Sequence, residues 1–490
     1  MQRPLPWKDL LGDRAPVLRS TAAMLTSLTA LAATSLIAAP SAVPLSEPCT
    51  LRRTQAHHSE GVDTWNSAYP RPTRDLDAVL VFLSFPDAAP LTTPAELTAD
   101  HFPATSEFFE RASYGKFALR PHPRREWLEM PQPSTAYAIR RDWNATHRAA
   151  YIRDALATAD PHVDFSRYDI VYFVADPHAP GVDSDATKVV NLQTPLEVDG
   201  ADLRRVVTVF ERHPPDRLVL AHETGHVFDL PDLYHRPADG KGDWDTHVGD
   251  WDLMGSQFAL APDLFAWHKW KLGWLEPRQV TCVRGTGTTR LTLEAVGAGP
   301  RGAYEGETEE VTGTGEGEGE VGHAGGGGGR VGGAGTGAGT GAGARAGAGT
   351  GAVGGGGGAA AGVAAGVRGF GAGRGTKLAV VRTGPDSALG IEARGAVGND
   401  AAVCTQGVLV YRIRSGAESG GGPMEVLDAH PRTEACWEES VYPPLADAPV
   451  RVGESFTVPG DDVRVDVEGR TASGAWTVRI TTGTTGVTGR

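Results

Sequence analysis

Short apolar runs alternate with helical patterns along the first half of the chain. Residues 79–85 read VLVFLSF and residues 168–175 read YDIVYFVA. Both runs are short and rich in strand-forming residues, so they predict buried strands. Residues 106–112 and 141–158 show the mixture of apolar and charged positions that is typical of helices. This alternation predicts a mixed domain, α/β or α+β, that extends to about Pro277.

The pattern changes after this point to short alternating runs in a sequence rich in Thr, Val and Gly. Residues 408–413 and 476–480 are examples, and they predict a small β-rich domain. An insert at 311–375 interrupts it and holds 31 of the 64 glycines of the chain. Such a composition buries too little apolar surface to offset the entropy lost on ordering, so we expect a disordered insert. The fold class expected for the whole chain is α+β.

These patterns divide the 490 residues into five segments. The expected segments are a signal peptide (1–42), a mature N-terminal segment or short propeptide (43–77), a catalytic domain (78–277), a β-rich domain (278–310 and 376–490) and the Gly/Ala-rich insert (311–375). The net charge is −14, which argues against a nucleic-acid partner because such a partner requires a basic face.

The N-terminus has the order of a secretory signal. Lys8, Arg14 and Arg19 precede residues 22–40, which are uncharged and rich in Ala and Leu. An uncleaved membrane anchor is the alternative, because a stretch of roughly 18 residues can just span a bilayer. We favour cleavage, since Thr and Ser recur within the stretch. The expected product is a secreted, extracellular protein with no membrane attachment after cleavage.

The clearest candidate chemistry lies in the motif HETGH at 222–226. Asp216 follows two prolines and can cap the helix that carries this motif. His222 and His226 are then four residues apart on one face, and both can bind one zinc ion at about 2.0–2.1 Å. Glu223 lies off that face, where it can accept a proton from water without binding the metal.

A catalytic zinc needs a third protein ligand and an open position. Asp232, six residues after His226, and Asp229, three residues after it, are both carboxylates in reach. Pro231 predicts that the helix stops just before Asp232, which can then approach the metal from the opposite side. We prefer Asp232 for this reason, and Asp229 remains the alternative.

Together, the motif and its surroundings resemble the immune inhibitor A family of secreted bacterial metallopeptidases. The central resemblance is carried by HETGH, by LPDLY at 230–234 and by VGDWDLMGS at 248–256. It extends to FFERASYGKF at 108–117, VDFSRYDIVYFV at 163–174, APDLFAWHKWKLGWL at 261–275 and, more weakly, GVLVYRI at 407–413. Most of residues 78–277 and parts of the β-rich tail are covered.

This resemblance implies a zinc endopeptidase with a metzincin-like fold that acts on proteins or peptides. It implies that His222, His226 and Asp232 bind zinc, that Glu223 is the catalytic acid/base, and that Met254 forms the Met-turn beneath the metal. The family pattern has Gly three residues after the second His, whereas this chain has Asp229. Asp adopts the left-handed conformation at modest cost, so the turn remains possible.

Several other residues near the motif have two interpretations. His235 and His247 are expected on the surface or behind the ligands, and the tryptophans after them are expected to pack in the core: Trp251, Trp267, Trp270 and Trp274. An acidic group could hold calcium, although it lacks the spacing of an EF-hand loop: Asp243, Asp245, Asp250 and Asp252. A solvated or supporting role is at least as good an interpretation of these four aspartates.

Four cysteines are compatible with disulfides in an exported protein. Cys404 and Cys436 lie in the same β-rich segment, so we expect them to pair and Cys49 to pair with Cys282, although three pairings are possible. The function expected is that of a secreted zinc endopeptidase. The alternative is a catalytically weakened surface or matrix-binding protein that keeps the fold, and the departure at Asp229 and the large insert favour it.

Overall fold

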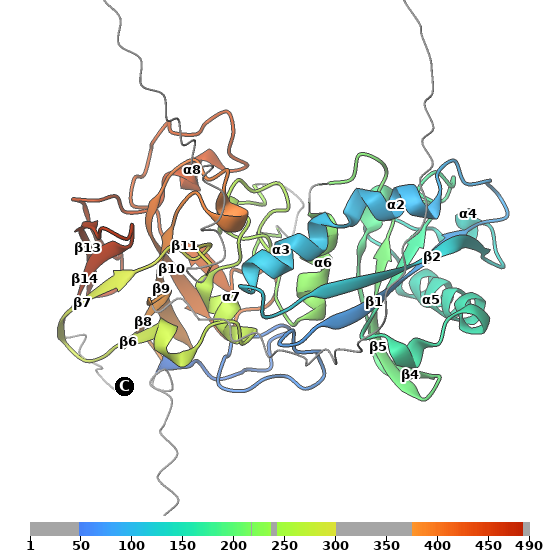
Figure 1. Ribbon diagram of the computed structural model, residues 1–490, viewed down its shortest axis with the longest axis horizontal. Helices are drawn as coiled ribbons and strands as arrows, with labels where there is room; N and C mark the ends of the chain where they lie inside the picture. Colours follow the sequence, from blue (N-terminus) through green and yellow to red (C-terminus); the bar gives the residue numbers. More distant parts are fainter. Residues whose placement is uncertain (1–48, 217, 237–242, 300–374, 484–490) are drawn as a thin grey trace, which may run out of the picture. The chain divides into compact units, whose positions relative to one another are not determined.

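The computed structural model describes residues 49–216, 218–236, 243–299 and 375–483 (Figure 1). The expected signal peptide and, except for Gly375, the Gly/Ala-rich insert lie outside these residues. All described residues belong to one compact unit of mixed α+β structure with several sheets, in agreement with the predicted class. No helix within the described ranges is long and apolar enough to cross a membrane.

The first sheet has five strands in the order β2-β1-β3-β5-β4. β1 (Leu76–Ser84) pairs in parallel with β2 (Leu119–Glu129) and with β3 (Ile170–Ala175). β3 also pairs in parallel with β5 (Ala201–Val209), and β4 (Lys188–Val198) runs antiparallel to β5 at the sheet edge. The two apolar runs therefore form the central strands β1 and β3, as predicted.

Helices cover both faces of this sheet (Figure 1). Because side chains alternate along a strand, Leu80 and Phe82 of β1 join one core, with α3 and α6, while Val79 and Val81 join a second core with α5. The α-helices are α2 (Pro94–His101), α3 (Ala104–Ala112), α4 (Ser134–Tyr137), α5 (Ala145–Ala159), α6 (Val219–Val227), α7 (Ala266–Lys271) and α8 (Pro443–Ala446). The predicted helices at 106–112 and 141–158 correspond to α3 and α5.

Short 3-10 turns connect many of these elements. They are η2 (Asp160–His162), η3 (Phe165–Arg167), η4 (Ser184–Ala186), η5 (Gly249–Trp251), η6 (Pro277–Gln279) and η7 (Gly398–Asp400). Two of them follow an aspartate whose side chain starts the turn: Asp164 accepts a hydrogen bond from Ser166 N before η3, and Asp183 accepts one from Asp185 N before η4.

The second half of the described chain forms two further sheets, of order β11-β10-β9-β8-β6 and β12-β13-β14-β7. Their strands are β6 (Val280–Val283), β7 (Gly287–Leu293), β8 (Leu378–Arg382), β9 (Ser387–Arg394), β10 (Gly407–Arg414), β11 (Met424–Val426), β12 (Ser455–Thr457), β13 (Val463–Arg470) and β14 (Trp476–Thr482). The alternating runs at 408–413 and 476–480 lie in β10 and β14, as predicted. A core between the two sheets contains Ile391, Val465 and Ile480.

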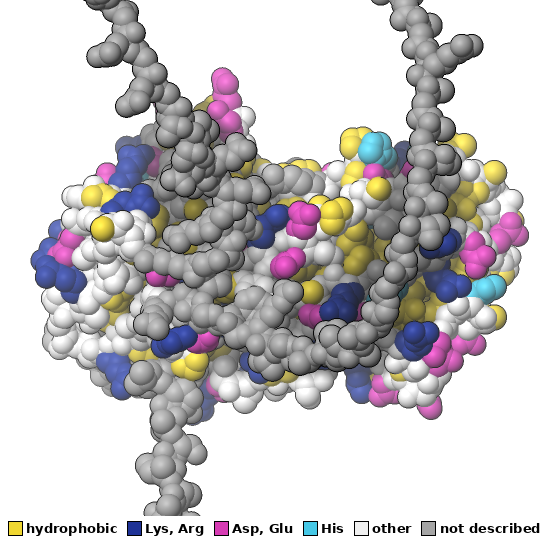
Figure 2. All heavy atoms as spheres, viewed as in Figure 1, with side chains coloured by type: hydrophobic (Ala, Val, Ile, Leu, Met, Phe, Trp, Pro, Cys, Tyr) yellow, Lys and Arg dark blue, Asp and Glu magenta, His cyan; other side chains and the backbone are white. Residues whose placement is uncertain are grey.

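The β-rich part and the helical part share one core. Leu409 and Tyr411 of β10 belong to the same cluster of buried residues as Phe109 of α3 and Leu220 of α6. On the face drawn in Figure 2, acidic and basic side chains are interspersed over the described residues. The shared core therefore joins β10 of the C-terminal half to the helix that carries the HETGH motif.

Both predicted disulfides are present. Cys49 pairs with Cys282 and Cys404 pairs with Cys436, with sequence separations of 233 and 32 residues. The first bond fastens the N-terminal end of the described chain to β6. Two disulfides are compatible with an oxidising, extracellular environment.

Candidate metal centre

Helix α6 carries the HETGH motif, and it begins at Val219 rather than at Asp216. Leu218, directly before it, has φ of 63°, and no side chain caps the helix start. A capping residue has extended backbone geometry, which the left-handed Leu218 does not offer. The prediction that Asp216 caps this helix is therefore wrong. Its carboxylate instead accepts a hydrogen bond from Gln257 Nε2 at 3.1 Å.

The other end of α6 is closed by a Schellman motif. Asp229 has φ of 65°, its N–H donates to His226 O at 3.2 Å, and Leu230 N donates to Gly225 O at 3.1 Å. The helix thus ends at Val227, and this reversal rather than Pro231 stops it. Asp229 occupies the position where glycine is usual, which agrees with the expectation that Asp tolerates the turn.

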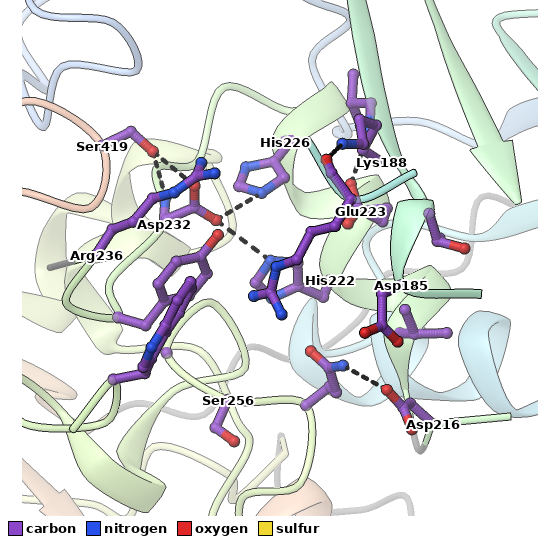
Figure 3. Close-up of a pocket in the computed structure, with 18 of the residues that line it drawn as sticks. Asp185, Lys188, Asp216, His222, Glu223, His226, Asp232, Arg236, Ser256 and Ser419 are labelled. Carbon is purple, nitrogen blue, oxygen red and sulfur yellow. Dashed lines mark hydrogen bonds and ion pairs between the residues drawn. The ribbon is translucent and has the colours of Figure 1, made fainter. Parts of the chain in front are cut away.

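The reversed chain brings Asp232 back to the two histidines (Figure 3). Asp232 Oδ1 lies 3.0 Å from His226 Nε2 and 3.4 Å from His222 Nε2. One ligand atom from each of the three side chains lies within 4.8 Å of the others. Among the described residues, this is the only group of three or more His, Cys, Asp or Glu side chains that meets this distance.

Backbone carbonyls fix the orientation of both imidazole rings. His222 Nδ1 lies 2.9 Å from Leu253 O, and His226 Nδ1 lies 2.8 Å from Leu230 O. A carbonyl oxygen only accepts, so Nδ1 carries the proton in each neutral ring and Nε2 presents a lone pair. Asp232 Oδ1 is buried without a hydrogen-bond partner. Three electron-pair donors therefore converge on one position, which is the arrangement that suits a cation.

The pKa of His226 in the metal-free protein reflects its closeness to the carboxylate of Asp232. Burial alone would lower the pKa of His226, but the negative charge of Asp232, whose Oδ1 lies 3.0 Å from Nε2, raises the pKa to about 9. Burial opposes ionisation of Asp232 as well, yet His226 and His222 hold the pKa of Asp232 well below its usual value. Without a metal, a proton on His226 thus balances the carboxylate, and a metal ion would displace this proton.

Glu223 is buried beside this group but does not belong to it. Its Oε2 accepts a hydrogen bond from Val189 N of the edge strand β4 at 2.8 Å. Burial, and to a lesser extent the charge of Asp232, raise the pKa of Glu223, although both histidines act in the opposite direction. A carboxylate whose pKa is raised is better suited to take up and return a proton near neutral pH.

Met254 packs directly beneath the motif. A Cβ atom at Gly225 would lie only 2.5 Å from Met254 Sδ, so a side chain at the third residue between the two histidines would force Met254 to shift. Leu233 N donates to Met254 O at 2.9 Å, which holds the segment after Asp232 against the same turn. Met254 therefore lies against the helix that carries the two histidines, and Gly225 is a residue that the sequence pattern did not single out.

Asp229, the alternative third ligand, points away from the histidine pair. Its carboxylate forms an ion pair with Arg53, and its Oδ1 lies 2.9 Å from His58 Nδ1. It is fully buried and contributes no atom to the group formed by His222, His226 and Asp232. The structure thus places Asp232, and not Asp229, beside the two imidazoles.

Ser419 supports Asp232 from the C-terminal half of the chain. Its hydroxyl donates to Asp232 Oδ2 at 3.1 Å and accepts from Asp232 N at 2.8 Å, and Gly420 N donates to Asp232 O at 2.9 Å. Nothing in the sequence indicates this contact, because 187 residues separate Ser419 from Asp232. These bonds leave Oδ1 to face the histidines.

The remaining residues considered from the sequence do not join the group. The rings of His235 and His247 pack edge to face at 5.2 Å from one another. The four aspartates do not form a second group within the described ranges. Asp252 accepts from Met254 N at 2.8 Å and Asp250 accepts from Leu260 N at 2.9 Å, so both stabilise the backbone around Met254.

The tryptophans are buried or partly buried in the first core, as expected: Trp251, Trp267, Trp270 and Trp274.

The three side chains lie in a cavity of about 640 Å³. Edge strand β4 and the loop before it form one wall, through Thr187, Lys188, Val189 and Asn191. The cavity also exposes charged and aromatic groups, among them Arg141, Asp185, Glu211, Asp216, Arg236, Trp244 and Phe258. Figure 3 shows Glu223 and Lys188 on one side of the group and Arg236 and Ser419 on the other.

No protein-family model matches the chain, and a search of curated proteins finds no match. The case for a function therefore rests on the geometry of this site and on the motif that builds it.

Proposed function

We propose that this protein is a secreted, zinc-dependent endopeptidase with a metzincin-like fold. One observation carries the proposal: His222 Nε2, His226 Nε2 and Asp232 Oδ1 converge as electron-pair donors, and Asp232 Oδ1 has no hydrogen-bond partner. Two imidazole nitrogens and one carboxylate oxygen form a donor set that suits zinc, and three protein ligands leave one tetrahedral position open. Zinc held there would supply a Lewis acid that polarises a carbonyl group and acidifies water.

Glu223 is the proton carrier in this proposal. Val189 N holds Oε2 of this carboxylate, which fixes its orientation beside the histidines. The carboxylate takes a proton from the attacking water and delivers it to the nitrogen of the leaving amine. Its buried environment favours both transfers, because the raised pKa of Glu223 brings its protonated form within reach.

The three side chains that would hold zinc line a cavity that suits an extended peptide. Strand β4 lies at the sheet edge, where it pairs only with β5, and its first residues line the cavity. An edge strand can bind an extended chain through its free backbone groups. We therefore assign peptide or protein substrates.

We propose that this activity takes place outside the cell, after the protein is secreted. The expected signal sequence at 1–42 directs export, and the disulfides Cys49–Cys282 and Cys404–Cys436 are of the kind that persist in oxidising surroundings.

The test uses the purified full-length protein. We expect about one zinc per chain by metal analysis, cleavage of casein, loss of cleavage after treatment with a chelator, and recovery when zinc is added. Bound zinc without casein cleavage would support the alternative, a surface or matrix-binding protein that keeps the fold. Absence of zinc would remove the basis of both proposals.

A further inference from the structure

Residues 49–60, here named the N-terminal strap, pass beside the end of α6. The strap begins at Cys49, which is bonded to Cys282. Arg53 forms an ion pair with Asp229, and His58 Nδ1 lies 2.9 Å from Asp229 Oδ1. Two side chains of the strap thus share the carboxylate at the Schellman turn that closes the motif helix.

The contacts of the strap are buried. His58 is 4% exposed, and Glu60 and Asp229 are both 0% exposed. Glu60 Oε1 lies 2.8 Å from His268 Nε2, and Glu60 Oε2 lies 3.7 Å from Lys271 Nζ. Removing the strap would take these partners away from Asp229, His268 and Lys271, and breaking a buried ion pair by removing one partner is strongly destabilising.

The strap also contacts the metal centre itself. The ring of His58 stacks on the ring of His226 with a centroid separation of 5.6 Å and an interplanar angle of 23°. His58 therefore contacts one member of the group through its ring face and holds, through Asp229, the turn that connects His226 to Asp232. Lys271 Nζ donates to Asp229 O at 2.6 Å and fixes the same turn from α7.

We propose that the strap remains in the working protein, and that His58 is a positioning residue that orients His226 through its ring contact and its bond to Asp229. The part that concerns His226 rests on the proposed function, in which this residue binds zinc. The retention of the strap does not. On this assignment, Asp229 replaces the glycine of the family pattern because its carboxylate fastens the strap, and residues 49–60 are not a removable propeptide.

The positioning role is tested with His58→Ala and His58→Phe, with Gln55→Ala as the matched control on the exposed side of the strap. Zinc affinity is measured by competition with a chelator, and the absorption spectrum is recorded after cobalt substitution. We expect both His58 variants to lose about 10–100-fold in zinc affinity, the range for residues that support a ligand, and to show a changed cobalt spectrum. Gln55→Ala should match the wild type.

His58→Phe preserves the ring volume, so it decides the question if His58→Ala does not fold. Wild-type zinc affinity and an unchanged cobalt spectrum in a folded His58 variant would overturn the positioning role.

Retention of the strap is tested without reference to zinc. The intact mass of the secreted, folded protein should include residues 49–60, and a folded protein that begins after Glu60 would overturn the proposal. In addition, Asp229→Asn should lower the unfolding temperature of the metal-free protein, whereas Asp202→Asn, at an exposed carboxylate of β5, should not. If the wild type binds no zinc, the proposed function fails while these two measurements still decide whether the strap is retained.

Discussion

Glu223 illustrates how one residue acquires a role from its surroundings. The carboxylate lies beside the histidine pair without joining it, and a backbone N–H of β4 holds one of its oxygens. Burial raises its pKa. These features suit a group that moves a proton rather than one that binds a metal.

Glu223→Gln preserves the shape of the side chain and still accepts from Val189 N, but it cannot take up a proton. We expect zinc content and thermal unfolding to match the wild type, while kcat falls by about 10²–10⁴-fold, the usual contribution of general acid–base catalysis. Steady-state cleavage of a fluorogenic peptide, together with metal analysis, provides the measurement. A variant with near wild-type kcat would contradict the assignment.

Under the proposed function, Asp232 and Ser419 differ in what each offers the metal. Asp232→Ala removes a proposed ligand atom, so we expect the variant to lose zinc on dialysis. Ser419→Ala removes only the hydroxyl that holds Asp232 Oδ2, and should lower zinc affinity by about 10–100-fold. Chelator competition measures both effects, with exposed Ser67→Ala as the control. If Ser419→Ala bound zinc as tightly as the wild type, Ser419 would have no supporting role.

At the scale of elements, the motif helix is determined by what packs beneath it. Helix α6 has nine residues. One of them, Thr224, is hydrogen bonded through Oγ1 to the hydroxyl group of Tyr172 in β3 at 2.8 Å. Met254 fills the space below Gly225. The helix and the turn around Met254 therefore pack directly against one another, so we expect a change in either to displace the histidines.

Gly225→Ala has two opposing effects. Alanine favours a helix over glycine by about 1 kcal/mol, but the added methyl group would lie 2.5 Å from Met254 Sδ, and overpacking typically costs about 1–3 kcal/mol. We expect the clash to dominate, with a lower free energy of unfolding and weaker zinc binding. Gly299→Ala is the control, because a Cβ there meets nothing within 4 Å. Urea denaturation of the two variants measures the difference, and equal stability would contradict the packing argument.

For the whole molecule, stability depends on a buried cluster that joins segments distant in sequence. His268 of α7 lies 2.8 Å from Glu60 of the strap and 3.2 Å from Asp252, near Met254. Burial opposes the charged form, but Glu60 and Asp252 together raise the pKa of His268 to about 9. The charged imidazole thus connects the N-terminal strap, α7 and the segment around Met254.

This raised pKa predicts a dependence of stability on pH. A histidine whose pKa is raised in the folded state makes its full contribution to stability below its unfolded pKa of 6.5. This contribution is lost as the pH rises through its folded pKa of about 9. The difference amounts to about 3 kcal/mol, at about 1.4 kcal/mol per pKa unit. Urea denaturation at pH 6.5 and pH 9 should show this loss in the wild type and a smaller loss in His268→Gln. The exposed His162→Gln should behave as the wild type, and identical pH profiles for all three proteins would refute the prediction.

The sequence by itself determined the features that depend on local periodicity. The apolar runs at 79–85 and 168–175 became the central strands β1 and β3, because strand formers bury both faces of a covered sheet. The i, i+4 spacing of His222 and His226 placed both imidazoles on one helical face. The helix start at Asp216 was wrong because capping depends on the backbone angles of Leu218, which the sequence pattern does not specify.

Only the tertiary structure decided between Asp232, which the sequence favoured, and Asp229, and only it added groups that are distant along the chain. It placed Asp232 beside the histidines and turned Asp229 toward Arg53 and His58. It also brought in Ser419, whose separation from Asp232 along the chain leaves no local signal. Secondary structure follows from interactions between near neighbours in sequence, whereas these contacts depend on how a shared core packs the N-terminal strap, the motif helix and the C-terminal sheets together.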